Sequence, residues 1–533
     1  MKQRQYPFLR LAALFTLSAC LLCAQGLCED TASASAETGI SGQQVDLSAL
    51  FSDRDLDGSY DESSAVSIRL DGSSASCDSD AVAIDGTQII LLDEGVYILS
   101  GTLEDGQVVV NAGEEDKVQI VLQGAQINSS TSAAIYALEA DKVFLTLAKD
   151  TENTLTNGGE YVDIDDNAID AVVFSKTDLT LNGSGSLLVE ATAGHGIVSK
   201  DDLVITGGTY VITAENHGLS AKDTLAVAGG LFTINAGKDA IHAENADDAT
   251  LGTIAIADGL FTLNAQGDTI SASGSLQITG GTFDLITAGG SASVDLTSST
   301  AFSFGGRGGM AQAQPSDTED TSTSQKGIKA EGTMTITGGT FVADTVDDCL
   351  HSGRAMLITS GEFTLSSGDD AIHSDSAVTI ADGTFTIPTC YEGIEGLSVT
   401  IEGGTYAITS YDDGINAAGG ADSSGFGGRQ QDQFASGSDS FILISGGTLT
   451  IVSSGDCIDS NGDLTLNGGV LDLTCNGSGN TALDTDGTYA NNGADVTTND
   501  GSENNPGSMG GGRRNATQRQ RDLAPSGPSQ AAP

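Results

Sequence analysis

The fold is decided by a stretch that runs from residue 338 to 351, GGTFVADTVDDCLH, and recurs 22 residues later, at 360–373, as SGEFTLSSGDDAIH. Both copies join a glycine turn and an aromatic residue to a pair of acids. Units that open with a similar turn begin at Gly207, Gly229, Asp258, Gly280, Gly338, Ser360, Asp382, Gly403, Gly446 and Gly468. The spacings between them are 22, 29, 22, 58, 22, 22, 21, 43 and 22 residues, so the basic period is 22.

Short segments with alternating apolar residues fill each unit, such as LVI at 203–205 and YVI at 210–212. Alternation between glycine turns predicts strands with one face inward, and no segment shows helical periodicity. A 22-residue unit is too short for a propeller blade, which needs about 40 residues. We therefore expect an all-β, right-handed parallel β-helix, a solenoid with about 22 residues per coil. The following aromatic residues would then form one internal column: Tyr210, Phe232, Phe261, Phe283, Phe341, Phe363, Phe385 and Tyr406.

The domain organisation follows from where this repeat is clear. Residues 1–26 are expected to be a signal peptide, and 27–150 an N-terminal cap with the first irregular β coils. The solenoid itself is predicted over 151–488, with insertions near 289–325 and 418–438 that are rich in Gly, Ser, Asp and Gln. Residues 489–533 turn Asn-, Gly-, Gln- and Pro-rich, which predicts a disordered tail.

The net charge and the N-terminal segment limit the possible partners and the location of the protein. With 21 Lys and Arg against 73 Asp and Glu, the formal net charge is −52, which argues against nucleic acid as a partner. Basic residues precede an apolar run at 11–23, which is the layout of an export signal and is too short to span a bilayer. Cleavage near Ala24 competes with a lipobox in which Cys20 would carry lipid. No transmembrane span is predicted, and we expect a secreted or cell-surface monomer.

A second element of the repeat is acidic in its later copies. In-register stacking places Asp348, Asp370, Glu392, Asp413 and Asp456 in one row, with Asp347, Asp369 and Asp412 beside it. Carboxylates about 5 Å apart repel by about 1 kcal/mol per pair even in water. Raised carboxyl pKa values or bound cations would relieve this repulsion, and clustered oxygen ligands favour calcium. The eight residues are thus candidate calcium ligands; the alternative is an exposed acidic face screened by salt.

Two further stretches carry a family resemblance: AVVFSKTDLTLNGSG at 171–185 and GIVSKDDLVITGG at 196–208. They resemble the secreted bacterial carbohydrate-binding β-helix family, whose fold is similar to that of pectate lyases. The resemblance covers about residues 45 to 485. It implies calcium binding and attachment to cellulose or acidic plant polysaccharides.

These observations favour a non-catalytic, calcium-dependent binder of polysaccharide, either acidic or cellulose-like. Tyr391 and Tyr411 could stack on single sugars, and Glu395 is a further candidate sugar-binding residue. One alternative is a calcium-dependent polysaccharide lyase, which needs a basic residue near the metal. The basic residues available near the acidic row are Arg354, Lys326 and Lys329. The other alternative is a surface adhesin or matrix protein that binds another protein.

Overall fold

The computed structural model describes residues 46–162, 165–296, 324–418 and 440–506. The expected signal peptide, Cys20, most of both insertions and residues 507–533 of the expected tail lie outside the described residues. In the described ranges the chain forms 44 strands and a single short α-helix, α1 (Asp53–Leu56). The expectation of an all-β protein is confirmed.

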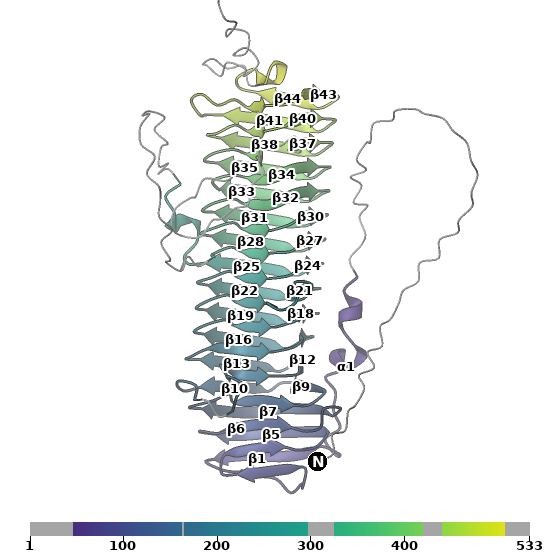
Figure 1. Cartoon of the computed structure of the whole chain (residues 1–533), viewed down its shortest axis with the longest axis vertical. Coiled ribbons are helices and arrows are strands. Elements are labelled where there is room, and N and C mark those ends of the chain that lie inside the picture. Colours follow the sequence, from purple (N-terminus) through teal and green to yellow (C-terminus); the bar gives the residue numbers. More distant parts are fainter. Residues whose placement is uncertain (1–45, 163–164, 297–323, 419–439, 507–533) are drawn as a thin grey trace, which may run out of the picture. The chain divides into compact units, whose positions relative to one another are not determined.

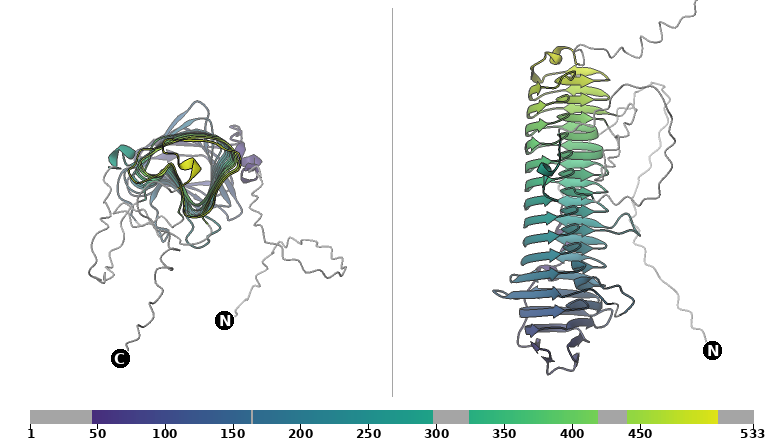
Figure 2. Two further views of the ribbon diagram at one scale, coloured as in Figure 1. Left: turned by 90° about the horizontal axis from the view of Figure 1, so that it is seen from above. Right: turned by 90° about the vertical axis from the view of Figure 1, so that its left-hand side faces the viewer.

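The strands stack in parallel along one axis (Figure 1). Most of them pair with the strands three places before and after in the chain. For example, β16 (Thr209–Ala214) pairs in parallel with β13 (Ser186–Ala191) and β19 (Leu231–Ala236). Successive strands therefore belong to three different columns, and each column is a parallel sheet that runs along the axis. Seen along that axis, the chain traces one outline again and again (Figure 2).

The register between coils follows the repeat. Leu350 pairs with Ile372, and Ile372 pairs with Ile394, so partners lie 22 residues apart. Where extra residues intervene, the register is kept: Ile270 pairs with Ile328, 58 residues later. Parallel strand stacking of the solenoid type is therefore confirmed, whereas the right-handed sense and the size of a complete coil stay predictions.

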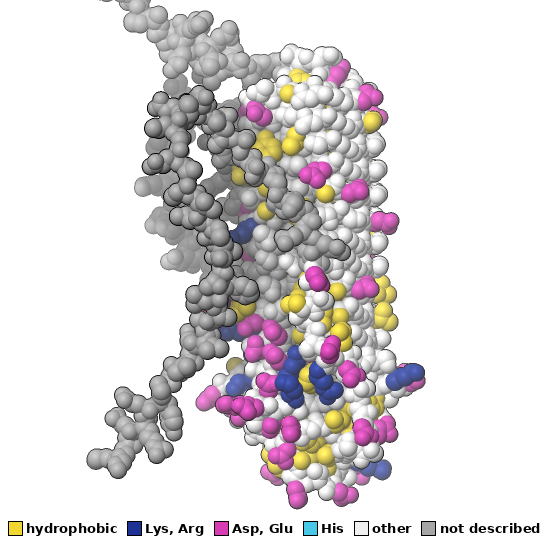
Figure 3. All heavy atoms as spheres, turned by 90° about the vertical axis from the view of Figure 1, so that its right-hand side faces the viewer, with side chains coloured by type: hydrophobic (Ala, Val, Ile, Leu, Met, Phe, Trp, Pro, Cys, Tyr) yellow, Lys and Arg dark blue, Asp and Glu magenta, His cyan; other side chains and the backbone are white. Residues whose placement is uncertain are grey.

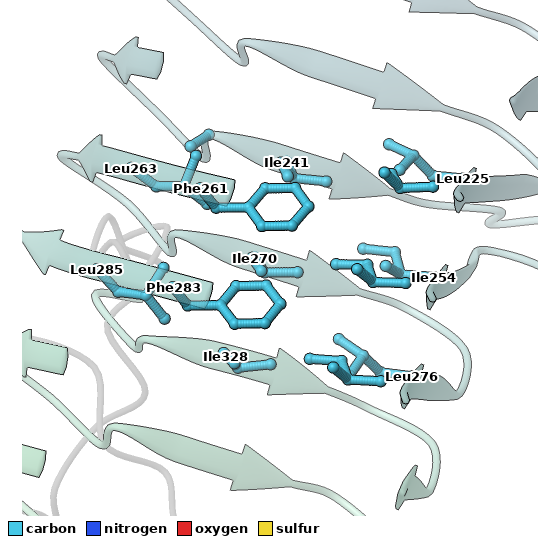
Figure 4. Packing of buried hydrophobic residues seen from close by; sticks show 14 of the residues in the cluster. Leu225, Ile241, Ile254, Phe261, Leu263, Ile270, Leu276, Phe283, Leu285 and Ile328 are labelled. Atoms are coloured by element: carbon cyan, nitrogen blue, oxygen red, sulfur yellow. The ribbon is translucent and has the colours of Figure 1, made fainter. Parts of the chain in front are cut away.

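The aromatic column is buried in the core, as expected (Figure 4). Neighbouring phenylalanine rings from Phe232 to Phe385 lie nearly parallel, with centroids 4.7 to 4.8 Å apart. The preceding glycine makes room for each ring. At Gly339 the φ angle is +113°, and a Cβ atom would lie 3.0 Å from the ring of Phe341. The glycine–aromatic signature is thus a packing requirement.

Both ends of the solenoid differ from its middle. At the N-terminal end, β1 (Val66–Gly72) pairs antiparallel with β2 (Ala75–Ser76), and β3 (Val82–Asp85) forms an antiparallel hairpin with β4 (Gln88–Leu91). The first parallel pairing joins β1 to β5 (Gly95–Leu103).

At the C-terminal end, the boundary predicted at 488 is wrong. Two further strands, β43 (Tyr489–Asn491) and β44 (Asp495–Thr498), continue the columns by pairing with β40 (Asp463–Leu466) and β41 (Val470–Cys475). These two strands supply backbone partners for β40 and β41, which would otherwise end the sheets with open edges.

One of the three columns carries the candidate site. Its strands in the repeat region are β14 (His195–Ser199), β17 (Leu219–Ala221), β20 (Ile241–Ala243), β23 (Ile270–Ala272), β26 (Ile328–Ala330), β29 (Leu350–Ser352), β32 (Ile372–Ile380), β34 (Ile394–Ile401), β36 (Ile415–Ala417) and β39 (Ile458–Ser460).

Candidate functional site

A row of polar side chains precedes the strands of this column. Each member stands two residues before a buried aliphatic residue that is in register with its neighbours, such as Leu350 and Ile372. We call the row the turn file. Its members are His195, His217, Asp239, Asp268, Lys326, Asp348, Asp370, Glu392, Asp413 and Asp456. The five acids predicted to stack are therefore in one row.

Members of the turn file are joined by hydrogen bonds from one coil to the next. Asp348 Oδ1 accepts the backbone N–H of Asp370 at 3.1 Å, and Asp370 Oδ1 accepts that of Glu392 at 3.2 Å. Asp413 Oδ1 accepts the N–H of Asp456 at 2.6 Å. Asp348, Asp370 and Asp413 therefore have a structural role, because each satisfies a backbone donor that strand pairing leaves over. Sequence reasoning missed this role.

Lys326 neutralises Asp347 and Asp348, on the coil that follows it. Its Nζ atom lies 2.9 Å from Asp347 Oδ1 and 2.8 Å from Asp348 Oδ2, and all three side chains are buried. Burial opposes ionisation of Asp348, but the ammonium of Lys326 holds the pKa of that carboxyl well below its usual range. A count of basic residues along the chain understates this compensation. Lys326 stands two residues before Ile328, just as Asp348 stands two residues before Leu350. This shared position in the repeat is the sequence signal that could have placed Lys326 in the same row as the acids.

His373 neutralises the middle of the row. Its Nδ1 atom lies 3.0 Å from Asp370 Oδ2 and 3.3 Å from Glu395 Oε2. Burial disfavours the imidazolium, yet the bond to Asp370 and the nearby carboxylates raise the pKa of His373 well above its usual value. Glu395, predicted to bind sugar, is only 7% exposed and lies against this ring.

The last acids of the row are different. Burial and neighbouring carboxylates raise the pKa of Glu392 and of Asp413 well above the usual range. Burial raises the pKa of Asp456 to about 6, and Asp484 adds to the shift. Within the described part of the chain, no lysine, arginine or histidine forms an ion pair with these three residues. Excess negative charge therefore collects at this end.

Gly455 brings further oxygens to the same place. A Cβ atom at this glycine would lie 2.2 Å from Asp413 Oδ1 and 2.4 Å from Asp412 Oδ1. Because glycine has no Cβ atom, the carboxylates of Asp412 and Asp413 on the preceding coil can pack directly against the backbone of this turn. We call Glu392, Asp412, Asp413 and Asp456 the acidic end.

The other predicted residues lie along the same row. Carboxylate oxygens of Asp347, Asp348 and Asp369 come within 4.8 Å of one another. Tyr411 is 45% exposed, as expected for a sugar contact. Tyr391, expected to be exposed, is half-buried. Its N–H and C=O bond to Asp369 and Asp412, which hold its backbone between two coils.

A family model of carbohydrate-binding domain-containing proteins matches residues 85–371 and 369–507. The chain belongs to this family, which confirms the resemblance found in the sequence.

Two known proteins are similar to parts of the chain. A carbohydrate-binding domain-containing protein of Acetivibrio thermocellus is 36% identical over 137 residues, which is 25% of this chain and 48% of that relative. The match thus spans about half of the relative's length. A solved structure, described as the polysaccharide lyase-like protein from C. thermocellum, gadolinium derivative, is 30% identical, with a TM-score of 0.39. That similarity covers 42% of this chain and 92% of the other.

None of the helices in the described ranges is long and apolar enough to cross a bilayer.

Proposed function

We propose that this protein is a non-catalytic, calcium-dependent polysaccharide-binding protein of the bacterial cell exterior. Its ligand is an acidic plant polysaccharide or a cellulose-like glycan. The observation that carries the proposal is the acidic end, where carboxylates on successive coils raise one another's pKa and form no ion pair with a basic residue among those described. Family membership supports a carbohydrate as the partner. The export signal supports the location, with Cys20 as a candidate lipid anchor.

The donor chemistry of the acidic end fits calcium. Calcium takes six to eight oxygen ligands and tolerates irregular geometry. Glu392, Asp412, Asp413 and Asp456 would hold the ion. The group of Asp347, Asp348 and Asp369 fits less well, because the ammonium of Lys326 already binds two of its carboxylates. Asp370 likewise has an imidazole partner in His373.

A bound calcium ion would make the acidic end attractive to an anionic glycan. The ion supplies positive charge that can pair with uronate carboxylates, which the bare carboxylates would repel. The exposed ring of Tyr411 lies one residue before Asp412 and supplies a surface on which a sugar can stack. Successive coils repeat along the axis, so a long glycan can follow them.

Binding is favoured over lyase chemistry by the state of the basic residues. Lys326 is 3% exposed and its ammonium is bound by two carboxylates, so it is a poor proton acceptor. Lys329 Nζ is 2.8 Å from Glu331 Oε1. Arg354, which is exposed, is the candidate base if the protein is a lyase.

The test is retention on insoluble polymers. The protein is mixed with insoluble polygalacturonate and with cellulose, in calcium and in EGTA, and the supernatant is assayed for protein and for unsaturated sugars. We expect retention on at least one polymer in calcium, loss of retention in EGTA, and no sugar product. Release of unsaturated sugars would make the protein a lyase. Absence of retention on both polymers would overturn the proposal and favour the adhesin.

Matched variants connect the result to the acidic end. The double variant Asp413→Asn/Asp456→Asn keeps the side-chain oxygens of the turn file but removes two charges. We expect it to lose calcium-dependent retention. The control is Asp472→Asn, an exposed aspartate on β41. Equal retention of both variants would refute calcium binding at the acidic end.

A further inference from the structure

A cavity lies against the histidine end of the turn file. It has a volume of about 340 Å³. Three successive coils line it, with His195, Lys200, His217, Lys222, His242 and Glu244 among the lining residues. We call it the histidine pocket. It is at the lower end of the ~300–1,000 Å³ typical of small-ligand sites, which suits a single sugar ring.

The hydrogen bonds of the turn file fix the state of two imidazoles. His195 Nδ1 accepts the backbone N–H of His217 at 3.3 Å, and His217 Nδ1 accepts that of Asp239 at 3.1 Å. A nitrogen that accepts a hydrogen bond carries no proton, so the proton of each neutral ring is on Nε2. Burial lowers the pKa of His195 to about 4 and that of His217 to about 3, which keeps both rings neutral.

These two rings can therefore donate a hydrogen bond from Nε2; in His195 this nitrogen lies 3.7 Å from Asp170 Oδ2. Their Nε2–H groups have no lone pair for a metal, even though ligand atoms of His217, Asp239 and His242 lie within 4.8 Å of one another. The rings stack on one another, with centroids 5.0 Å apart for His195 and His217 and 4.2 Å apart for His217 and His242. The stack presents donors from successive coils on the same side of the solenoid.

Two lysines line the pocket together with these donors. Lys200 is exposed, with its Nζ 5.3 Å from the centroid of the Phe174 ring. Lys222 Nζ pairs with Asp247 Oδ2 at 2.9 Å, but both side chains are exposed, so the pair is weak and can rearrange. On the face drawn in Figure 3, Lys and Arg side chains form one cluster on the lower part and lie singly toward the edges, with acids spread around them.

The third imidazole adds to the positive charge. His242 Nδ1 lies 2.8 Å from Asp239 Oδ2. Burial disfavours the charged form of His242, but the bond to Asp239 raises the pKa of the ring. Asp239 is itself occupied, because its Oδ1 accepts the N–H of Asp268 at 2.8 Å. Two acids with largely exposed side chains also line the pocket. Glu244 is 63% exposed and its Oε2 lies 3.4 Å from His242 Nε2, and Asp247, the partner of Lys222, is 81% exposed.

We propose that the histidine pocket binds the carboxylate-bearing ring of an acidic sugar directly, without calcium. The carboxylate accepts hydrogen bonds from imidazole Nε2–H groups and pairs with the lysine ammonium groups. The proposal rests on the proposed function for its choice of an acidic sugar. It adds a second subsite, on the coils that contain no part of the acidic end.

The test is titration of the full chain with a short oligogalacturonate in EGTA, followed by calorimetry. We expect binding that is calcium-independent, and no binding of a neutral oligosaccharide of the same length. Lys222→Met should weaken the affinity at least tenfold. Lys117→Met is the matched control, because Lys117 is also an exposed lysine paired with an exposed aspartate, and it should leave the affinity unchanged.

A second variant distinguishes loss of ligand binding in the pocket from loss of the fold. His217→Asp keeps a side-chain acceptor for the turn file, since aspartate already occupies this position at Asp239, but it replaces a donor with a negative charge. We expect it to abolish binding in EGTA and to leave calcium-dependent retention on the polymer intact.

Three results would overturn the inference. Absence of binding in EGTA together with calcium-dependent retention refutes the pocket and leaves the proposed function standing. Equal affinity for a sulfated oligosaccharide refutes the assignment to a carboxylated sugar. Binding that survives Lys222→Met and His217→Asp refutes the location.

Discussion

At both ends of the turn file a side chain accepts the backbone N–H of the next coil, but the accepting group differs. On the coils of His195 and His217, imidazole nitrogens accept the amide of the next coil. On the coils of Asp348, Asp370 and Asp413, carboxylate oxygens do the same. The backbone requires only an acceptor at this position. The charge of the side chain is therefore free to differ from coil to coil. Neutral imidazoles that can donate hydrogen bonds occupy one end of the turn file, and carboxylates occupy the other.

Lys326 interrupts the row between these two ends. Its ammonium cannot accept a hydrogen bond, and it reaches forward to Asp347 and Asp348 instead. The acids near Lys326 and His373 are thus compensated within the protein, whereas Glu392, Asp413 and Asp456 are not by any described basic residue. The comparison teaches that stacked carboxylates alone do not make a cation site. Their negative charge must also lack a basic side chain that neutralises it.

The largest effect is expected from removing the buried ammonium. Lys326→Met would remove the buried ammonium that pairs with Asp347 and Asp348, and loss of one partner of a buried ion pair costs about 3–5 kcal/mol, although His351 Nδ1 stays 2.9 Å from Asp348 Oδ2. Urea denaturation should show this loss in the free energy of unfolding. Lys117→Met is the control and should cost less than about 1 kcal/mol, because Lys117 and its partner Asp141 are both exposed. A Lys326 variant as stable as the control would contradict internal compensation.

A smaller effect on the free energy of unfolding is expected at Asp413, where two substitutions distinguish the role of the hydrogen-bond acceptor from that of the charge. Asp413→Ala removes the acceptor of the Asp456 N–H, which should destabilise the protein by about 1–3 kcal/mol. Asp413→Asn keeps an oxygen acceptor and removes a repelling charge. In EGTA it should be at least as stable as the unchanged protein. If both variants unfold at the same urea concentration, the hydrogen bond between coils does not contribute.

The smallest effect is a dependence on pH. Asp456 has a pKa of about 6 in the fold against 3.8 as the ordinary value, so the fold binds its proton more tightly than the unfolded chain does. Its stabilising contribution is present below about pH 4 and is lost as the pH rises through about 6. Glu392 and Asp413 act in the same direction.

Calcium should change this dependence. In EGTA, the urea midpoint is expected to fall as the pH rises from about 4 to about 7. Calcium should remove most of the fall, because the ion favours the ionised carboxylates. Asp456→Asn in EGTA should show a shallower decline. A fall that is the same with and without calcium would argue against a cation at the acidic end.

Much of the fold could be predicted because its pattern is local. The 22-residue spacing of Phe341, Phe363 and Phe385 predicts stacked coils, and their rings do stack. The strands β43 and β44 escape that pattern, because Val470 pairs with Asp495 at an offset of 25 residues and without the glycine–aromatic signature.

The candidate site was only partly predictable. Stacking of the acids follows from the period, but their compensation depends on where side-chain atoms point. Lys326 stands 22 residues before Asp348, and the sequence does not say that its ammonium reaches that carboxylate. The state of His217 likewise depends on an amide from another coil. Such contacts join residues that only the folded register brings together.

The aromatic column has a consequence for how this protein can change over generations. Each ring contacts only the ring before and the ring after it, and Phe363, Phe385 and Tyr406 occupy equivalent places. Deletion of residues 364–385 would join Phe363 to a threonine, as the chain does now, and would seat its ring directly on Tyr406. Duplication of the same segment would add one ring. A gene can therefore lengthen or shorten the turn file by whole repeats, without any compensating substitution in the aromatic column.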